Sequence, residues 1–141
     1  MPSFEFESGV VTYTTKNGFE FSFNPTDISF SERLFNVFEQ MDKKHEKYRE
    51  EISTIADNKR IFEFANEKDK EMRSLIDGVF GLPVCDGVFG NMSLFALGGG
   101  LPVWANFVLA IMDEIDTAFA REQKATNPKI QKYLDKYKGI K

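Results

Sequence analysis

The chain has 141 residues, 42% of them hydrophobic and 15 of them phenylalanine, so it can bury a core without disulfides, a metal or a cofactor. The single cysteine, Cys85, excludes an internal disulfide and fits a reducing compartment, and the absence of a basic and apolar leader predicts no secretory signal. The net charge of −4 is uneven, because residues 121–141 carry seven Lys and Arg against two acids while residues 1–120 have a net charge of −9.

Residues 3–23 have the composition of β-structure. β-forming side chains follow one another at residues 11–15, and the next apolar residues alternate with polar ones at Phe19, Phe21 and Phe23. A lone hairpin is not stable in water, so this segment must pack on the rest of the domain. Phe4 and Phe6 either add a further strand or lengthen the first.

The turn between these strands decides which side chains share a face. With a three-residue loop that ends at Gly18, Tyr13 pairs with Phe21. Val11 then pairs with Phe23, and all four side chains lie on one face. A two-residue Asn-Gly loop would put the aromatic residues on opposite faces. We therefore predict a bulged hairpin with Gly18 in the left-handed conformation.

A helix is expected after the strand-breaking Asn24-Pro25 pair, begun either by a capping box at residues 29–32 or by Asp27. Its apolar residues recur with heptad spacing and form one narrow stripe among many charged side chains. This stripe, called the heptad seam below, consists of Leu34, Phe38, Met41, His45, Tyr48, Ile52 and Ile55, and its spacing reaches Phe62. Such a helix requires a helical partner, from the same chain or from a second copy, so the seam is a predicted interface. His45, the only histidine, is a polar seam residue of the kind that can set register or oligomeric state.

Residues 57–60 are weak helix formers but include no Gly or Pro, so two arrangements are open. Either the chain turns here into an antiparallel helical hairpin, which we favour, or one helix continues to about Ile76. In both cases an apolar stripe follows in the second half, at Ile61, Ala65, Met72, Leu75 and Ile76.

Two short motifs occur twice, DGVFG at residues 77–81 and 86–90 and GLPV at residues 81–84 and 100–103. A glycine after an apolar pair is typical of a helix end, and a proline shortly afterwards is typical of a helix start. We therefore predict that Gly81 and Gly90 end helices. A short helix is expected over 83–89 and a longer one over 102–123.

The apolar run from Leu101 to Met112 is too short to span a bilayer, so we predict the central helix of the core and no membrane span. Its apolar face comprises Trp104, Phe107, Val108, Ile111, Ile115, Ala118 and Phe119. Paired carboxylates can bind Mg²⁺ or transfer protons, but the acidic cluster on this helix has no second acidic motif to pair with. The cluster is predicted as the solvent edge of the helix and consists of Asp113, Glu114 and Asp116.

The remaining candidates for chemistry are a glycine run and a cysteine. Gly98-Gly99-Gly100 precedes a helix, but no phosphate-binding motif is present and no Lys or Arg occurs between Arg73 and Arg121. A tight or flexible turn is the predicted role of this run. Cys85 is expected to be a buried apolar side chain, which is the usual state of a free cysteine. The single histidine cannot build a metal site, and it does not form a convincing pair with this cysteine as base and nucleophile. We therefore predict no catalytic, metal-binding or cofactor-binding residues, and no enzymatic activity.

The combined pattern predicts an α+β protein with one globular domain at residues 1–124. Within it, residues 1–24 form the β-hairpin region and residues 28–124 a mostly helical body. Residues 125–141 are predicted as a basic tail or short helix, which could contact an acidic partner surface through Lys129, Lys132, Lys136 and Lys138.

Three stretches carry a family resemblance: FNPTDISFSERLFNVFEQ at 23–40, IDGVFG at 76–81 and VFGNMSLFALGGGLPVWANFVLAIMDEID at 88–116. In these the chain resembles small proteins encoded in the tail-gene regions of Firmicutes phages and prophages, which are similar to tail assembly chaperones. The resemblance implies a non-enzymatic protein that binds the tape-measure protein or another tail protein, in the bacterial cytoplasm during phage assembly. It carries no catalytic residues. Self-association into a homo-oligomer through the heptad seam is compatible with it.

A nucleic-acid-binding head or packaging accessory protein is the alternative function, and it would use the basic tail. The acidic body and the absence of interleaved aromatic and basic residues elsewhere argue against nucleic acid as a partner.

Overall fold

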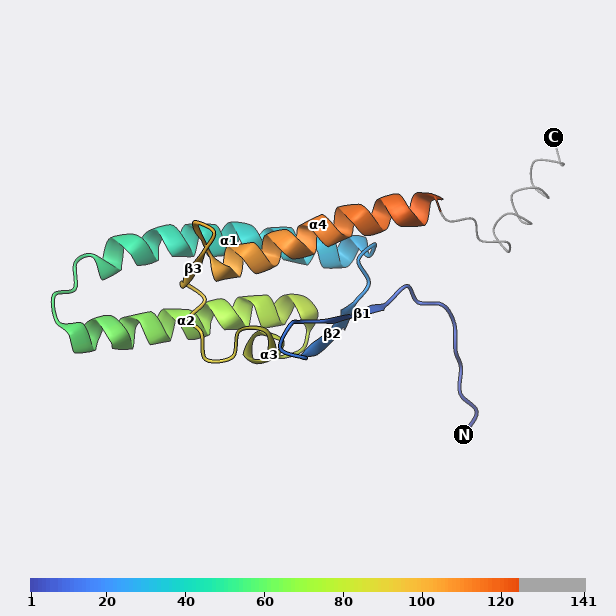
Figure 1. Cartoon of the computed structure of the whole chain (residues 1–141), viewed down its shortest axis with the longest axis horizontal. Coiled ribbons are helices and arrows are strands. Elements are labelled where there is room, and N and C mark those ends of the chain that lie inside the picture. The colour runs from blue at the N-terminus through green and yellow to red at the C-terminus, as the bar shows by residue number, and fades with distance from the viewer. Residues whose placement is uncertain (125–141) are drawn as a thin grey trace.

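The computed structural model describes residues 1–124, and the predicted tail contacts at Lys129, Lys132, Lys136 and Lys138 lie outside the described residues. The elements in chain order are β1 (Val11–Thr14), β2 (Glu20–Phe23), α1 (Ile28–Ile52), α2 (Asn58–Phe80), α3 (Cys85–Phe89), β3 (Leu97–Gly98), β4 (Leu101–Pro102) and α4 (Val103–Lys124). α1 and α2 form an antiparallel pair, α4 runs beside α1, and the β1–β2 hairpin lies near α3 (Figure 1). The predicted α+β class is confirmed.

The β1–β2 hairpin has the predicted register. Tyr13 lies opposite Phe21 and Val11 opposite Phe23, and Gly18 has φ 85°. The aromatic face packs on the helices, since the Phe23 ring centroid lies 4.7 Å from that of Phe30 on α1 and 5.8 Å from that of Phe80 on α2. The hairpin is therefore held by the aromatic core, as a two-stranded sheet must be.

Phe4 and Phe6 do not join this sheet. The structure assigns no strand before Val11, and the two side chains are 88% and 72% exposed. The prediction that they add a strand or lengthen β1 is therefore wrong for a single copy of the chain. A straight extension of β1 would also have put these even-numbered residues on the polar face, beside Thr12.

The helical hairpin is confirmed, but its turn lies slightly earlier than predicted. α1 ends at Ile52 and α2 begins at Asn58, so residues 58–60 are already the first turn of α2. Of the two predicted N-caps, Asp27 is the one used, because its carboxylate accepts a hydrogen bond of 3.0 Å from the backbone N–H of Ser29.

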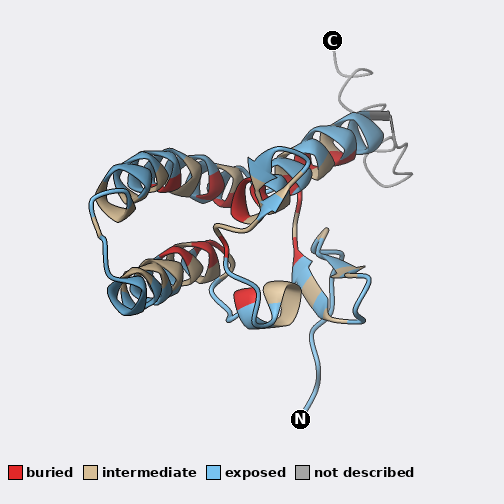
Figure 2. Ribbon diagram, turned by 60° about the vertical axis from the view of Figure 1, so that its left-hand side comes forward, coloured by how far each residue is buried: buried red, intermediate tan, exposed pale blue. Residues whose placement is uncertain are grey.

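The core lies where α1, α2 and α4 face one another, and Figure 2 shows the buried residues as stripes on these facing sides. Trp104, the largest fully buried side chain, is 2% exposed, as expected for the predicted core helix. The buried residues of the three helices include Leu34, Met41, Met72, Ile76, Val79, Val108, Ile111 and Ile115.

The repeated motifs separate helices, as predicted. Gly81, with φ 70°, ends α2, and Gly90, with φ 58°, ends α3. The helices after the prolines start a little later than predicted, at Cys85 and Val103. The β3–β4 hairpin was not predicted; its two-residue turn has positive φ at both Gly99 and Gly100, which is the requirement of a type I′ turn.

Candidate functional site

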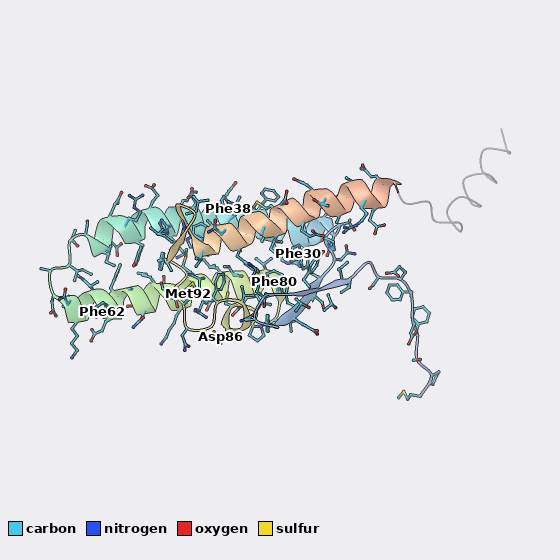
Figure 3. The ribbon with its side chains drawn as sticks, viewed as in Figure 1. Phe30, Phe38, Phe62, Phe80, Asp86 and Met92 are labelled. Atoms are coloured by element: carbon cyan, nitrogen blue, oxygen red, sulfur yellow. The ribbon has the colours of Figure 1, made fainter. Side chains whose placement is uncertain are left out.

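The most connected polar side chain of the described residues is Arg73 on α2. Its Nε donates to Oδ2 of Asp69 and its Nη1 to Oδ1 of Asp86, each at 2.9 Å. Its Nη2 donates to two backbone carbonyl oxygens at 2.9 and 2.7 Å, those of Gly90 and Met92. Figure 3 labels Met92 beside α2 and Asp86 below it. The other oxygen of Asp69 accepts from the N–H of Leu94 at 2.7 Å, so the network binds the loop after α3 to α2.

The Arg73 network joins α2 to α3 and to the loop after it, so its role is structural. The Arg73 guanidinium makes four hydrogen bonds and the side chain is 14% exposed. The fork of a guanidinium suits such multiple bonding, which a lysine cannot reproduce.

The aspartate of the first DGVFG repeat has a similar role. Oδ1 of Asp77 accepts from the backbone N–H groups of Val84 and Cys85, both at 2.9 Å, and so supports the start of α3. The Cys85 side chain is fully buried. Burial, and then the charge of Asp77, raise the pKa of the thiol well above its usual value, so Cys85 is protonated at neutral pH. The prediction of a buried apolar cysteine is confirmed.

The heptad seam faces the inside of the chain. Leu34 and Met41 are buried in the core, and Phe38 lies against Trp104, with ring centroids 5.8 Å apart. Tyr48 stacks on Phe95 at a centroid distance of 3.8 Å. The last two seam residues are half-buried near the hairpin turn and are Ile52 and Ile55. Contact between two copies through this seam would therefore require α1 to separate from its own α2 and α4.

His45 makes a specific polar contact within the seam. Its Nδ1 accepts a hydrogen bond of 3.2 Å from Nε1 of Trp104, which fixes the neutral ring with its proton on Nε2. Burial, and then the positive charge of Arg49, lower the pKa of His45. This polar seam residue therefore links α1 to α4 within one copy of the chain.

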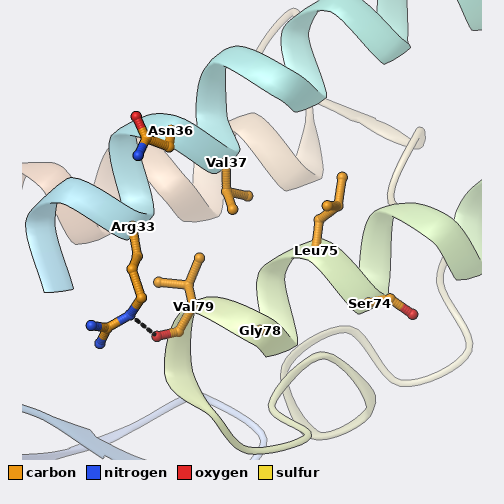
Figure 4. A pocket seen from close by; sticks show the side chains of 7 residues that line it. All are labelled: Arg33, Asn36, Val37, Ser74, Leu75, Gly78 and Val79. Carbon is orange, nitrogen blue, oxygen red and sulfur yellow. Dashed lines mark hydrogen bonds between the residues drawn. The ribbon is translucent and has the colours of Figure 1, made fainter. Parts of the chain in front are cut away.

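A groove lies on the opposite side of the helical hairpin from these contacts, between the N-terminal half of α1 and the C-terminal half of α2 (Figure 4). It has a volume of about 310 Å³. Its lining residues are Arg33, Asn36, Val37, Ser74, Leu75, Gly78 and Val79. This surface is called the α1/α2 groove below.

The α1/α2 groove combines apolar walls with a cationic rim. Val37 and Leu75 project into the space between the helices in Figure 4. Nε of Arg33 donates to the carbonyl oxygen of Val79 at 3.2 Å, while its Nη groups make no hydrogen bond with residues 1–124. A Cβ atom at Gly78 would meet no atom within 4 Å apart from the neighbouring backbone of its own helix, so α2 is open to close approach at this point.

A second hollow of about 370 Å³ lies at the other end of α1 but has only one wall. It is formed by one helix and the turn after it, through Glu46, Arg49, Glu50 and Ser53. The α1/α2 groove is the better candidate because two helices line it and its surface is mostly apolar, whereas charged and polar side chains line the second hollow.

The acidic cluster on α4 does not form a site. Glu114 accepts a hydrogen bond from the hydroxyl of Tyr13 at 3.0 Å and pairs with Arg121 at 3.2 Å. Burial, and then this carboxylate, raise the pKa of Tyr13 to about 12. Asp113 and Asp116 are exposed, as predicted for a solvent edge.

Within residues 1–124, no group of His, Cys, Asp and Glu is arranged to hold a metal ion. No helix in that part of the chain is both long enough and apolar enough to cross a membrane. Residues 1–124 carry 13 basic and 21 acidic side chains, so the interpretation as a nucleic-acid-binding protein depends on the tail beyond them.

Comparison of the chain with protein-family models, with curated proteins and with solved structures finds no match.

The α1/α2 groove was not predicted from the sequence. Val37 is next to the seam residue Phe38 but does not share the heptad spacing, and Gly78 belongs to a DGVFG repeat that predicts only a helix end. The one available signal was a glycine inside the last turn of a helix, ahead of the glycine that ends it.

Proposed function

We propose that this protein has a non-enzymatic role in phage tail assembly, and that it holds a helical segment of a tail protein, such as the tape-measure protein, in the α1/α2 groove. The resemblance to proteins of phage tail-gene regions supports the setting. The observation that carries the binding mode is a preformed apolar groove between two helices whose own seam is already satisfied.

The chemistry of the α1/α2 groove favours an amphipathic helix with an acidic residue beside its apolar face. Val37 and Leu75 offer apolar contacts on both sides, as helix-in-groove binding requires. The Nη groups of Arg33 can donate to a carboxylate at the rim. Gly78 lets the backbone of a bound helix come close to α2.

The test measures binding of a purified helical tape-measure fragment by isothermal titration calorimetry or fluorescence anisotropy. Gly78→Leu places a large side chain in the α1/α2 groove at a helical position where a Cβ meets nothing. We expect it to weaken binding at least tenfold, while Gly78→Ala retains most of the affinity. Arg33→Gln should weaken binding to fragments that carry the acidic residue.

Equal binding by Gly78→Leu and by the unchanged protein would exclude the α1/α2 groove as the contact surface. If every fragment of the tape-measure protein fails to bind the unchanged protein, the proposed partner is wrong. Circular dichroism of each variant checks that the helices are intact, so that a lost contact is not confused with a lost fold.

A further inference from the structure

The first nine residues, called the arm below, have a strand pattern but no strand partner among residues 1–124. Phe4 and Phe6 alternate with Glu5 and Glu7, so the two aromatic rings would share one face of an extended chain. Both rings are mostly exposed, and their nearest aromatic contact is with each other, at 5.9 Å between centroids. Two neighbouring exposed phenylalanines on a detached segment indicate a contact that a single copy does not make.

The base of the arm is fixed in a conformation that directs it away from its own domain. Gly9 has φ 74°, and Nδ2 of Asn24 donates to the carbonyl oxygen of Ser8 at 2.8 Å. A Cβ atom at Gly9 would lie 2.7 Å from the same Nδ2, so only glycine fits this turn. Figures 1 and 3 both show the arm leaving the body beyond β1.

The free edge of β1 offers the complementary surface. Thr15 donates its N–H to the carbonyl oxygen of Phe19, so alternate residues of β1 bond to β2. The backbone groups of Thr12 and Thr14 therefore point to the open edge, where another strand can pair with them.

An apolar hollow of about 280 Å³ lies beside this edge, between the hairpin and α4. Its apolar lining consists of Tyr13, Phe21, Phe23, Phe107, Ala110 and Ile111. An added strand with two inward aromatic side chains would pair with the edge and fill this hollow in one step.

We propose that the arm of one copy adds as a third strand to the free edge of β1 in a second copy, with Phe4 and Phe6 in the hollow beside Tyr13. Two copies that exchange arms about a twofold axis satisfy both edges at once. Glu5 and Glu7 then face solvent, on the same side as Thr12. The turn at Gly9 favours the second copy over the arm's own domain.

Engineered cysteines test the pairing between copies. Glu5→Cys and Thr12→Cys are made in separate chains, mixed and oxidised mildly. Cys85 does not interfere because it is fully buried. We expect a disulfide-linked pair of one chain of each kind, whereas Glu5→Cys mixed with Thr54→Cys, at the far hairpin turn, should give none. Added to the Glu5→Cys chain, the Phe4→Ser, Phe6→Ser double change should abolish both the link and the dimer mass in light scattering, and Glu7→Ser should abolish neither.

Two results would overturn the proposal. One is a link that forms only within a chain carrying both Glu5→Cys and Thr12→Cys, which would mean that the arm folds onto its own β1. The other is a monomeric mass without any link. The variants keep their fold because the arm makes no core contact and because Thr12 and Thr54 are exposed, so either result is interpretable.

Discussion

Replacing Gly78 with alanine and, in a second variant, Gly87 with alanine makes the same change at the same position of the two DGVFG repeats. Both glycines are helical, so propensity alone predicts the same gain for each, about 1 kcal/mol. The surroundings of the two positions differ. A Cβ at Gly78 meets nothing within 4 Å, whereas a Cβ at Gly87 overlaps the ring of Phe19.

The expected effects therefore have opposite signs. Gly78→Ala should raise the free energy of unfolding by about 0.5–1 kcal/mol, since it removes backbone freedom from the unfolded chain without strain. Gly87→Ala should lower it by about 1–3 kcal/mol, the usual cost of overpacking. The hairpin cannot move away freely, because Nδ2 of Asn17 donates to the carbonyl oxygen of Gly87 at 3.0 Å.

Urea unfolding monitored by the fluorescence of Trp104, the only tryptophan, measures both changes. Each 1 kcal/mol corresponds to a midpoint shift of about 0.3–1 M for a domain of this size. If both variants raise the midpoint, the contact between Phe19 and Gly87 is absent; if both lower it, the position of Gly78 is not open.

Three further outcomes follow from the polar contacts. Arg73→Ala should cost about 3 kcal/mol in urea unfolding, because it removes the cation that pairs with the half-buried carboxylate of Asp69 and leaves its Oδ2 without a partner. Asp86→Ala should cost under about 1 kcal/mol, since that side chain is 88% exposed. The lowered pKa of His45 means that the unfolded state binds the proton more readily than the folded state. The free energy of unfolding should therefore be highest above about pH 6.5 and fall as the pH drops below that value. His45→Gln should flatten this dependence. Cys85 should react with a thiol reagent only as fast as the protein unfolds, and rapid reaction of the folded protein would contradict its burial.

The hairpin and the helix ends could be predicted because local chemistry determines them. Only one loop length puts Tyr13 and Phe21 on the same face, and only glycine readily takes the left-handed conformation seen at Gly18 and Gly81. These choices depend on residues close together in the sequence, so no knowledge of the tertiary structure was needed.

The partner of the heptad seam could not be predicted from local sequence. Its spacing predicts that Leu34 and Met41 are covered, but the spacing is the same whether the partner is α2 or another chain. The turn at 53–57 brings α2 back against α1 as the partner of the seam, and that segment has neither Gly nor Pro to mark a turn. The Arg73 network was equally invisible, because it joins residues up to 25 positions apart in the sequence.

The two proposed contacts differ in how far they are preorganised, and this allows them to be separated. The α1/α2 groove lies between helices that core packing and the Arg33–Val79 hydrogen bond already hold, so a partner pays little to order it. The arm must lose conformational freedom when it pairs with a second copy. Deleting residues 1–8 should therefore abolish self-association and leave the affinity for a helical tail fragment unchanged. Loss of both activities in this truncated chain would mean that the partner recognises the dimer and not the groove of a single copy.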